Sequence, residues 1–136
     1  MSVHRISPAG LQPHTPYDHV AIATGTRHIH ISGQIARDAY GRPVGDGELA
    51  MQVEQVLRNT ARALEGADAS FADVVRMTFY VTQWSPEQIG AFMSGIERTA
   101  DELDIPHPLP PASLIGVDYL FEPGVRVELE TTAVAE

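Results

Sequence analysis

The chain of 136 residues has the length of one domain, 1–136, built around a single core. It carries 9 basic residues, all of them arginine, against 18 acidic residues, and its formal net charge is -9. A chain without lysine cannot form a Schiff base through its own side chains, and the negative charge disfavours nucleic acid and acidic membranes as partners. The absence of cysteine excludes disulfides, thiol nucleophiles and thiolate metal sites. No signal-peptide pattern opens the sequence and no stretch approaches the ~20 apolar residues of a membrane span, so we expect a cytoplasmic protein.

The N-terminal part of the chain is predicted to form strands, because short β-branched and apolar runs alternate with polar residues. The candidates are Val3 to Ile6, His19 to Thr24 and His28 to Ser32. Gly25 and Thr26, between the last two, predict a tight hairpin turn. The polar segment from Asp38 to Gly47 then predicts a loop.

Two amphipathic helices follow from the spacing of apolar residues. The first is predicted from Glu48 to Leu64, with Gly66 as its C-cap. The second is predicted to begin at the Ser85-Pro86-Glu87-Gln88 segment, which has the composition of a capping box, and to end before Pro106.

The remaining segments predict a capped helical turn and three more strands. The turn is Ser70 to Asp73, and the strands are Val74 to Thr82, Ala112 to Val117 and Val125 to Val134. The order of elements predicts an α+β domain: a mixed six-stranded sheet with two helices on one face.

Two of these strands are charged or polar on one face only. In the last strand Arg126, Glu128 and Glu130 alternate with apolar residues, and the strand after the helical turn carries polar residues in the same way. Since helices cover the apolar face, the polar face must meet solvent, a cavity or another subunit. This pattern predicts an oligomer with polar clefts between its subunits.

Four segments in this order give the sequence a family resemblance. They are Tyr17 before a long strand, Ser32-Gly33-Gln34-Ile35 at the end of the next strand, residues 73–78, and residues 127–130. Together they resemble the RidA (YjgF) family over nearly the whole chain. The resemblance implies a chorismate-mutase-like fold, a homotrimer and three small-molecule clefts at the subunit interfaces. It also implies hydrolysis of imines and enamines, which yields a 2-oxo acid and ammonia, without a cofactor or metal.

One position departs from the family pattern. The family carries an arginine near the fifth strand that grips the substrate carboxylate bidentately, whereas Pro110-Pro111-Ala112-Ser113-Leu114 places Ala112 there. The second helix also offers Met93 where the family commonly has an asparagine. The two differences together predict a changed ligand.

The resemblance assigns Glu128 to the attacking water, as a general base, where the residue alone would suggest a solvated strand glutamate. Tyr17 is predicted to cover the ligand or to pack at the interface, and Gly33 to present backbone groups to the cleft. Ala112, Ser113 and Leu114 are predicted to line it.

Arg126 has two interpretations in the sequence. It shares a predicted face with Glu128 and is a candidate for the missing positive charge, although an ion pair with Glu128 or Glu130 is the simpler account. His28 and His30 share a strand face, but without a third ligand nearby they predict no metal site.

Three functions therefore remain open from the sequence. The first is hydrolysis of an imine or enamine that is not a simple 2-imino carboxylate. The second is metabolite binding or regulation without catalysis. The third, endoribonuclease or translation-inhibitor activity, is disfavoured by the net charge.

Overall fold

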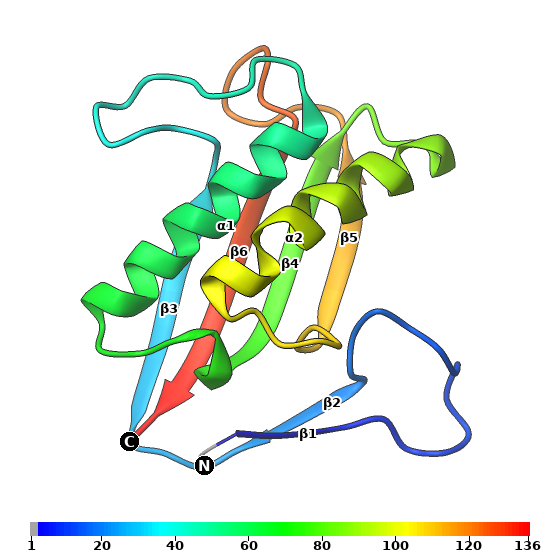
Figure 1. Ribbon diagram of the computed structural model, residues 1–136, viewed down its shortest axis with the longest axis vertical. Coiled ribbons are helices and arrows are strands. Elements are labelled where there is room, and N and C mark those ends of the chain that lie inside the picture. The colour runs from blue at the N-terminus through cyan, green and yellow to red at the C-terminus, as the bar shows by residue number, and fades with distance from the viewer. Residues whose placement is uncertain (1–2) are drawn as a thin grey trace.

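A four-stranded sheet covered on one face by two helices forms the body of the protein (Figure 1). The computed structural model describes residues 3–136. The strand order is β3-β6-β4-β5, in which β6 pairs antiparallel with β3 and β4, while β4 and β5 are parallel. The sheet and the two helices that cover it consist of β3 (Arg27–Gln34), α1 (Leu49–Gly66), β4 (Val74–Thr82), α2 (Ile89–Leu103), β5 (Ala112–Val117) and β6 (Val127–Ala135). The predicted α+β class, with two helices on one face of a mixed sheet, is confirmed.

The first two strands form a separate small sheet. β1 (Val3–Ile6) pairs antiparallel with β2 (Val20–Ala23), and neither strand hydrogen-bonds to the main sheet. The predicted six strands are thus divided four and two, and the predicted hairpin at Gly25 and Thr26 is wrong because β3 pairs with β6. A Cβ on Gly25 would lie 2.8 Å from the backbone carbon of Ala135. Glycine here serves a close backbone approach to the end of β6.

Arg5 holds the small sheet against the rest of the domain. Its guanidinium donates hydrogen bonds to the carbonyl oxygens of Phe71, Ala72 and Val74, each at 3.0 Å. These carbonyls belong to the 3₁₀ turn Phe71–Asp73 and to the first residue of β4. The capped turn predicted from Ser70 to Asp73 is confirmed, and a capping box between these two residues holds it.

The helix ends differ in detail from their predicted caps. α1 ends at Gly66, and Ala67 is its C-cap, with an N–H that bonds to the Ala63 carbonyl. Ser85 makes no side-chain cap, and a 3₁₀ turn, Pro86–Gln88, leads into α2 instead. Within residues 3–136 no helix has the length and apolar character needed to cross a membrane.

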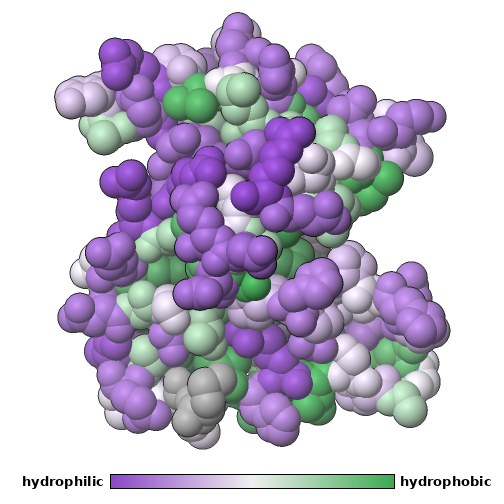
Figure 2. Space-filling view, viewed as in Figure 1, coloured by the Kyte–Doolittle hydropathy of each residue, from purple (hydrophilic) through white to green (hydrophobic). Residues whose placement is uncertain are grey.

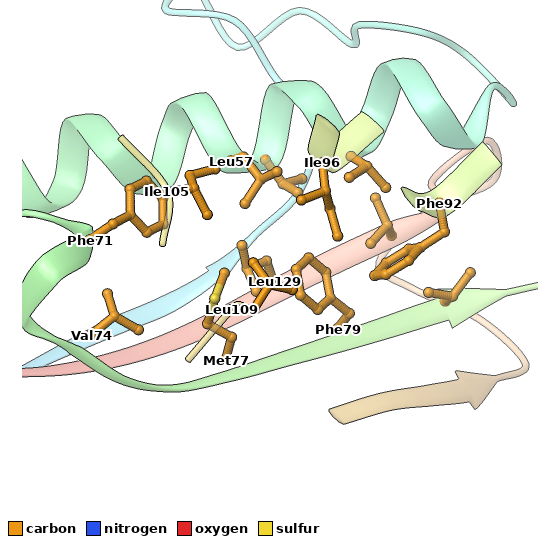
Figure 3. Close-up of a cluster of buried hydrophobic side chains, with 14 of the residues drawn as sticks. Leu57, Phe71, Val74, Met77, Phe79, Phe92, Ile96, Ile105, Leu109 and Leu129 are labelled. Carbon is orange, nitrogen blue, oxygen red and sulfur yellow. The ribbon is translucent and has the colours of Figure 1, made fainter. Parts of the chain in front are cut away.

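The core lies between the helices and the sheet (Figure 3). Leu57 and Ile96 point from the helices toward Phe79 and Leu129 on the strands. At the helix contact a Cβ on Gly95 would lie 2.6 Å from the Ala50 carbonyl oxygen, so glycine lets the two helices approach closely. The solvent side of the helices is mostly hydrophilic (Figure 2), as amphipathic helices require.

Candidate functional site

The face of the main sheet that the helices leave open is polar and internally hydrogen-bonded. Tyr80 on β4 stands opposite Glu128 on β6, and its hydroxyl donates to Glu130 at 2.7 Å. This hydrogen bond, with the carboxylate charge, raises the pKa of Tyr80. On the other side of β4, Arg76 donates to the hydroxyl of Ser113 on β5. The open face thus carries ordered polar groups across three strands.

Gly33 and Glu128 are brought together by an irregularity in β3. Ile31 pairs with Thr131 and Gln34 with Leu129, so β3 has one more residue than β6 between these two pairs. A Cβ on Gly33 would overlap the Glu128 carboxylate, lying 2.6 Å from its Cδ. The missing side chain therefore makes the room in which the half-buried Glu128 carboxylate sits.

Tyr17 lies beside the start of β5, away from Glu128. It forms an isolated parallel bridge with Leu109, reinforced by hydrogen bonds from Asp18 N–H to the Leu109 carbonyl and from Leu109 N–H to the Pro16 carbonyl. Its ring packs edge-on against His19, with centroids 5.3 Å apart, and contacts the core. Tyr17 therefore lies beside the segment that leads into Ala112, the first residue of β5.

The three predicted residues of β5 point to different faces. Ala112 is in register with Met77 and Leu114 with Phe79, and both pack against the core on the helix side. Ser113, in register with Thr78, faces the open side and accepts the hydrogen bond from Arg76. Of the three, Ser113 alone belongs to the polar face.

The predicted site residues fall into two separate groups within one chain. Glu128 and Gly33 form one group, and Tyr17 with the β5 residues forms the other. Neighbouring strands lie about 4.8 Å apart, so β6 and β5, with β4 between them, are separated by roughly 10 Å and β3 and β5 by roughly 14 Å.

Arg126 belongs to neither group, and the expected ion pair with Glu128 or Glu130 is not formed. Its guanidinium donates to the carbonyl oxygens of Thr82 and Gly47 and to Oε1 of Gln88. The residue precedes β6, so strand alternation does not govern its direction. Arg126 joins the N-terminal ends of the two helices to the sheet.

A hollow lined by arginines lies on the other side of Gly33. Its volume is about 720 Å³, and it is bounded by the end of β3, the following loop and α1. The sequence analysis does not predict this hollow, because its four arginines come from two segments that are apart in the chain. Among residues 3–136 no group of three or more His, Asp or Glu side chains is placed to hold a metal, and His28 and His30 are exposed on the open sheet face.

Comparison with known proteins places this arrangement among related folds. The family model described as "Endoribonuclease L-PSP" matches residues 8–135. A Yersinia pestis protein of unknown function, YyfB of the conserved Rid family, is 34% identical with a TM-score of 0.87, and the match covers 98% of this chain and 99% of that one. The YjgF gene product of E. coli is 24% identical with a TM-score of 0.69, covering 96% and 94%. E. coli TdcF, solved with bound serine, is 22% identical with a TM-score of 0.68, covering 96% and 94%. No curated protein matches the chain.

Proposed function

The chain belongs to the RidA/YjgF/L-PSP family, and from that membership we propose that it is a homotrimeric hydrolase of imines or enamines. Its clefts lie between subunits, and it acts on a substrate other than a simple 2-imino carboxylate. No cofactor takes part, and the protein works in the cytoplasm.

The observation that carries the proposal is the contact between Gly33 and Glu128. Glycine at position 33 leaves the room that the half-buried Glu128 carboxylate occupies, and so fixes a candidate general base on the open face of the sheet. In the proposed reaction Glu128 accepts a proton from a water molecule, and the oxygen of that water attacks the imine carbon. The proton passes to nitrogen, the carbinolamine releases ammonia, and a carbonyl product remains.

The proposed substrate class follows from Ala112. A buried substrate carboxylate needs a bidentate donor to offset its desolvation, and neither Ala112 nor the core-facing Leu114 has one to offer. Neutral or amine-bearing imines avoid this requirement. Arg126 does not replace the donor, because its guanidinium nitrogens are used within the fold.

The proposed trimer would unite the two groups of site residues. The open face of the sheet carries groups from three strands that another copy can cover, and β5 is an edge strand. We expect a trimer by light scattering at micromolar concentration. A monomer would remove the interfacial cleft and the reaction with it.

The reaction is tested by Glu128→Gln, which keeps the shape of the side chain but removes its basicity. We expect hydrolysis of a neutral enamine to fall by roughly 10²- to 10⁴-fold, the contribution typical of a general base. Glu130→Gln is the matched control, because it makes the same change two residues away on the same strand face. Equal losses in the two variants, or none in either, would contradict the assignment.

The altered substrate class is tested by Ala112→Arg. If only the anchoring charge is missing, hydrolysis of a 2-imino acid should rise at least roughly tenfold, equivalent to about 1.4 kcal/mol of transition-state stabilisation. Thermal unfolding of the variant controls for damage to the core contact of Ala112. A stable trimer of this variant without measurable hydrolysis would count against the role of Glu128.

That outcome would favour the second candidate, a metabolite-binding protein without catalysis. The specific observation behind it is the packing of Ala112 and Leu114 against the core, which leaves the start of β5 without a charged group. Such a protein would be stabilised by a metabolite through mass action, with no turnover. Endoribonuclease activity is less favoured, because a net charge of -9 opposes RNA binding, and absence of binding to single-stranded RNA at low salt would dismiss it.

A further inference from the structure

A hollow on the flank of α1 lies where β3 ends, beside Gly33. In Figure 1 the segment after β3 projects beyond α1 at the upper left, and Figure 2 shows the surface hollowed beneath it. Its volume of about 720 Å³ is in the range of small-molecule pockets, roughly 300 to 1,000 Å³. Four arginines line it, with one acidic residue: Arg37, Arg42, Arg58, Arg62 and Asp38.

Three of these arginines are balanced by carboxylates of the same chain. Arg37 pairs with Glu122, Arg42 with Asp38 at 3.0 Å, and Arg58 with Glu54 and Glu102 at 3.4 and 3.1 Å. The bonds to Glu102 and Glu54 raise the pKa of Arg58, as expected of a guanidinium that is already neutralised.

Arg62 is the exception. Within residues 3–136 it forms no ion pair, and its side chain is exposed at the rim of the hollow. The Arg42 guanidinium donates to Asp38 through Nε and lies over the Tyr40 ring, 5.0 Å from its centroid, and its two terminal nitrogens remain available. The hollow therefore presents one uncompensated positive charge and one partly free guanidinium in a protein whose net charge is -9.

The floor of the hollow is held in place by side-chain amides of α1. Asn59 donates to the carbonyl oxygens of Arg37 and Ile35 at 2.9 and 3.3 Å, and Gln55 donates to the Arg37 carbonyl at 3.2 Å. Asn59 and Arg62 are three residues apart on one helix face, so the same stripe that fixes the loop also carries the free charge. A site fixed in advance loses less entropy on binding.

We propose that this hollow binds a small organic monocarboxylate through Arg62 and the terminal nitrogens of Arg42. One uncompensated guanidinium matches one carboxylate, and the exposed ring of Tyr40 with the side chain of Ile35 offers apolar surface to the rest of the ligand. An RNA strand needs several uncompensated cations along its path, which the internal ion pairs do not leave. The site shares Gly33 with the proposed hydrolytic cleft but is built from other side chains, and binding there does not depend on turnover in the cleft.

The test is a titration of the ¹⁵N-labelled whole protein with butyrate and, as an uncharged isostere, with butyramide. Butyrate should produce saturable shifts in the amide signals of residues 33–42 and in the Nε signal of Arg62, and butyramide should not. Arg62→Gln should weaken butyrate binding at least roughly tenfold, equivalent to about 1.4 kcal/mol. Arg98→Gln is the matched control: it removes the same charge from an exposed arginine of α2 outside the hollow, and it should leave the affinity unchanged.

Several outcomes would overturn the proposal. Equal shifts with butyrate and butyramide would show that the carboxylate is not recognised. Equal weakening in both arginine variants would indicate a general charge effect, and shifts confined to Tyr17 and residues 112–114 would place the ligand in the other cleft. Binding of a single-stranded RNA oligonucleotide at 33–42, without binding of butyrate, would replace the proposed ligand class.

Discussion

The two faces of the central sheet use alternate residues of the same strands for different purposes. On the helix side Val127, Leu129 and Phe79 are at most 1% exposed and form a continuous core. On the open side their sequence neighbours Glu128, Glu130 and Tyr80 are hydrogen-bonded or half-buried polar groups. Neighbouring residues of one strand therefore contribute in turn to the core and to the polar face. Substitutions at adjacent positions should differ in their effects on the free energy of unfolding and on ligand chemistry.

The largest effect should come from the helix side. Phe79→Ala removes a fully buried ring that stacks edge-on against Phe92 at 4.9 Å between centroids, and we expect a loss of ~3 to 5 kcal/mol in the free energy of unfolding. Thr78→Ala, the adjacent position on the open side, should cost less than about 1 kcal/mol. Denaturant unfolding measures both, and similar losses would mean that the two faces are not energetically distinct.

A smaller effect is expected where the open face is most crowded. Gly33→Ala forces a methyl group into the Glu128 carboxylate and should cost ~1 to 3 kcal/mol, as overpacking does. Hydrolysis should fall as the carboxylate is displaced. Gly116→Ala is the matched control, because a Cβ there would meet the Trp84 Cβ at an ordinary 3.5 Å. If both variants behave alike, Gly33 does not position Glu128.

The smallest effect concerns the proton of Tyr80. Its pKa is raised because the phenol donates to Glu130, so the folded chain holds this proton at a pH where the unfolded chain has lost it. The stabilisation is therefore complete below the ordinary tyrosine pKa, about 10, and disappears as the pH rises through the folded value. In a spectrophotometric titration Tyr80→Phe should remove a tyrosine whose ionisation is shifted to higher pH. Glu130→Gln should make Tyr80 ionise earlier, and no change in either variant would show that the hydrogen bond is absent in solution.

Alternation and helical periodicity were sufficient to predict the strands and helices, but not which strands pair. The hairpin between β2 and β3 failed because Gly25 and Thr26 have turn composition, while the partner of β3 is more than 90 residues away in the chain. Long-range pairing leaves no local signal. The prediction for Arg126 is wrong for a related reason: strand alternation was extended to a residue that precedes β6, where the carbonyls of Thr82 and Gly47 and the side-chain oxygen of Gln88 accept from the guanidinium instead.

The candidate site was predictable only in part. Gly33 and Glu128 were linked through the family resemblance, and their contact adds a physical reason for the glycine. The arginine hollow was missed because Arg37 and Arg62 come together only after Asn59 anchors the intervening loop on α1. The available signal was a stripe of polar residues on one face of α1: Gln55, Arg58, Asn59 and Arg62. Helical periodicity indicates only that this face is exposed to solvent.

The position of β6 also bears on how the chain reaches this fold during synthesis. β6 follows every other element in sequence, yet it lies between β3 and β4. Until the ribosome has released it, those two strands have no partner to join them, and the apolar faces of both helices lack the middle of their sheet. Folding of the main layer therefore waits until β6 has left the ribosome, and before that the nascent chain exposes apolar surface that invites association with other chains or with chaperones.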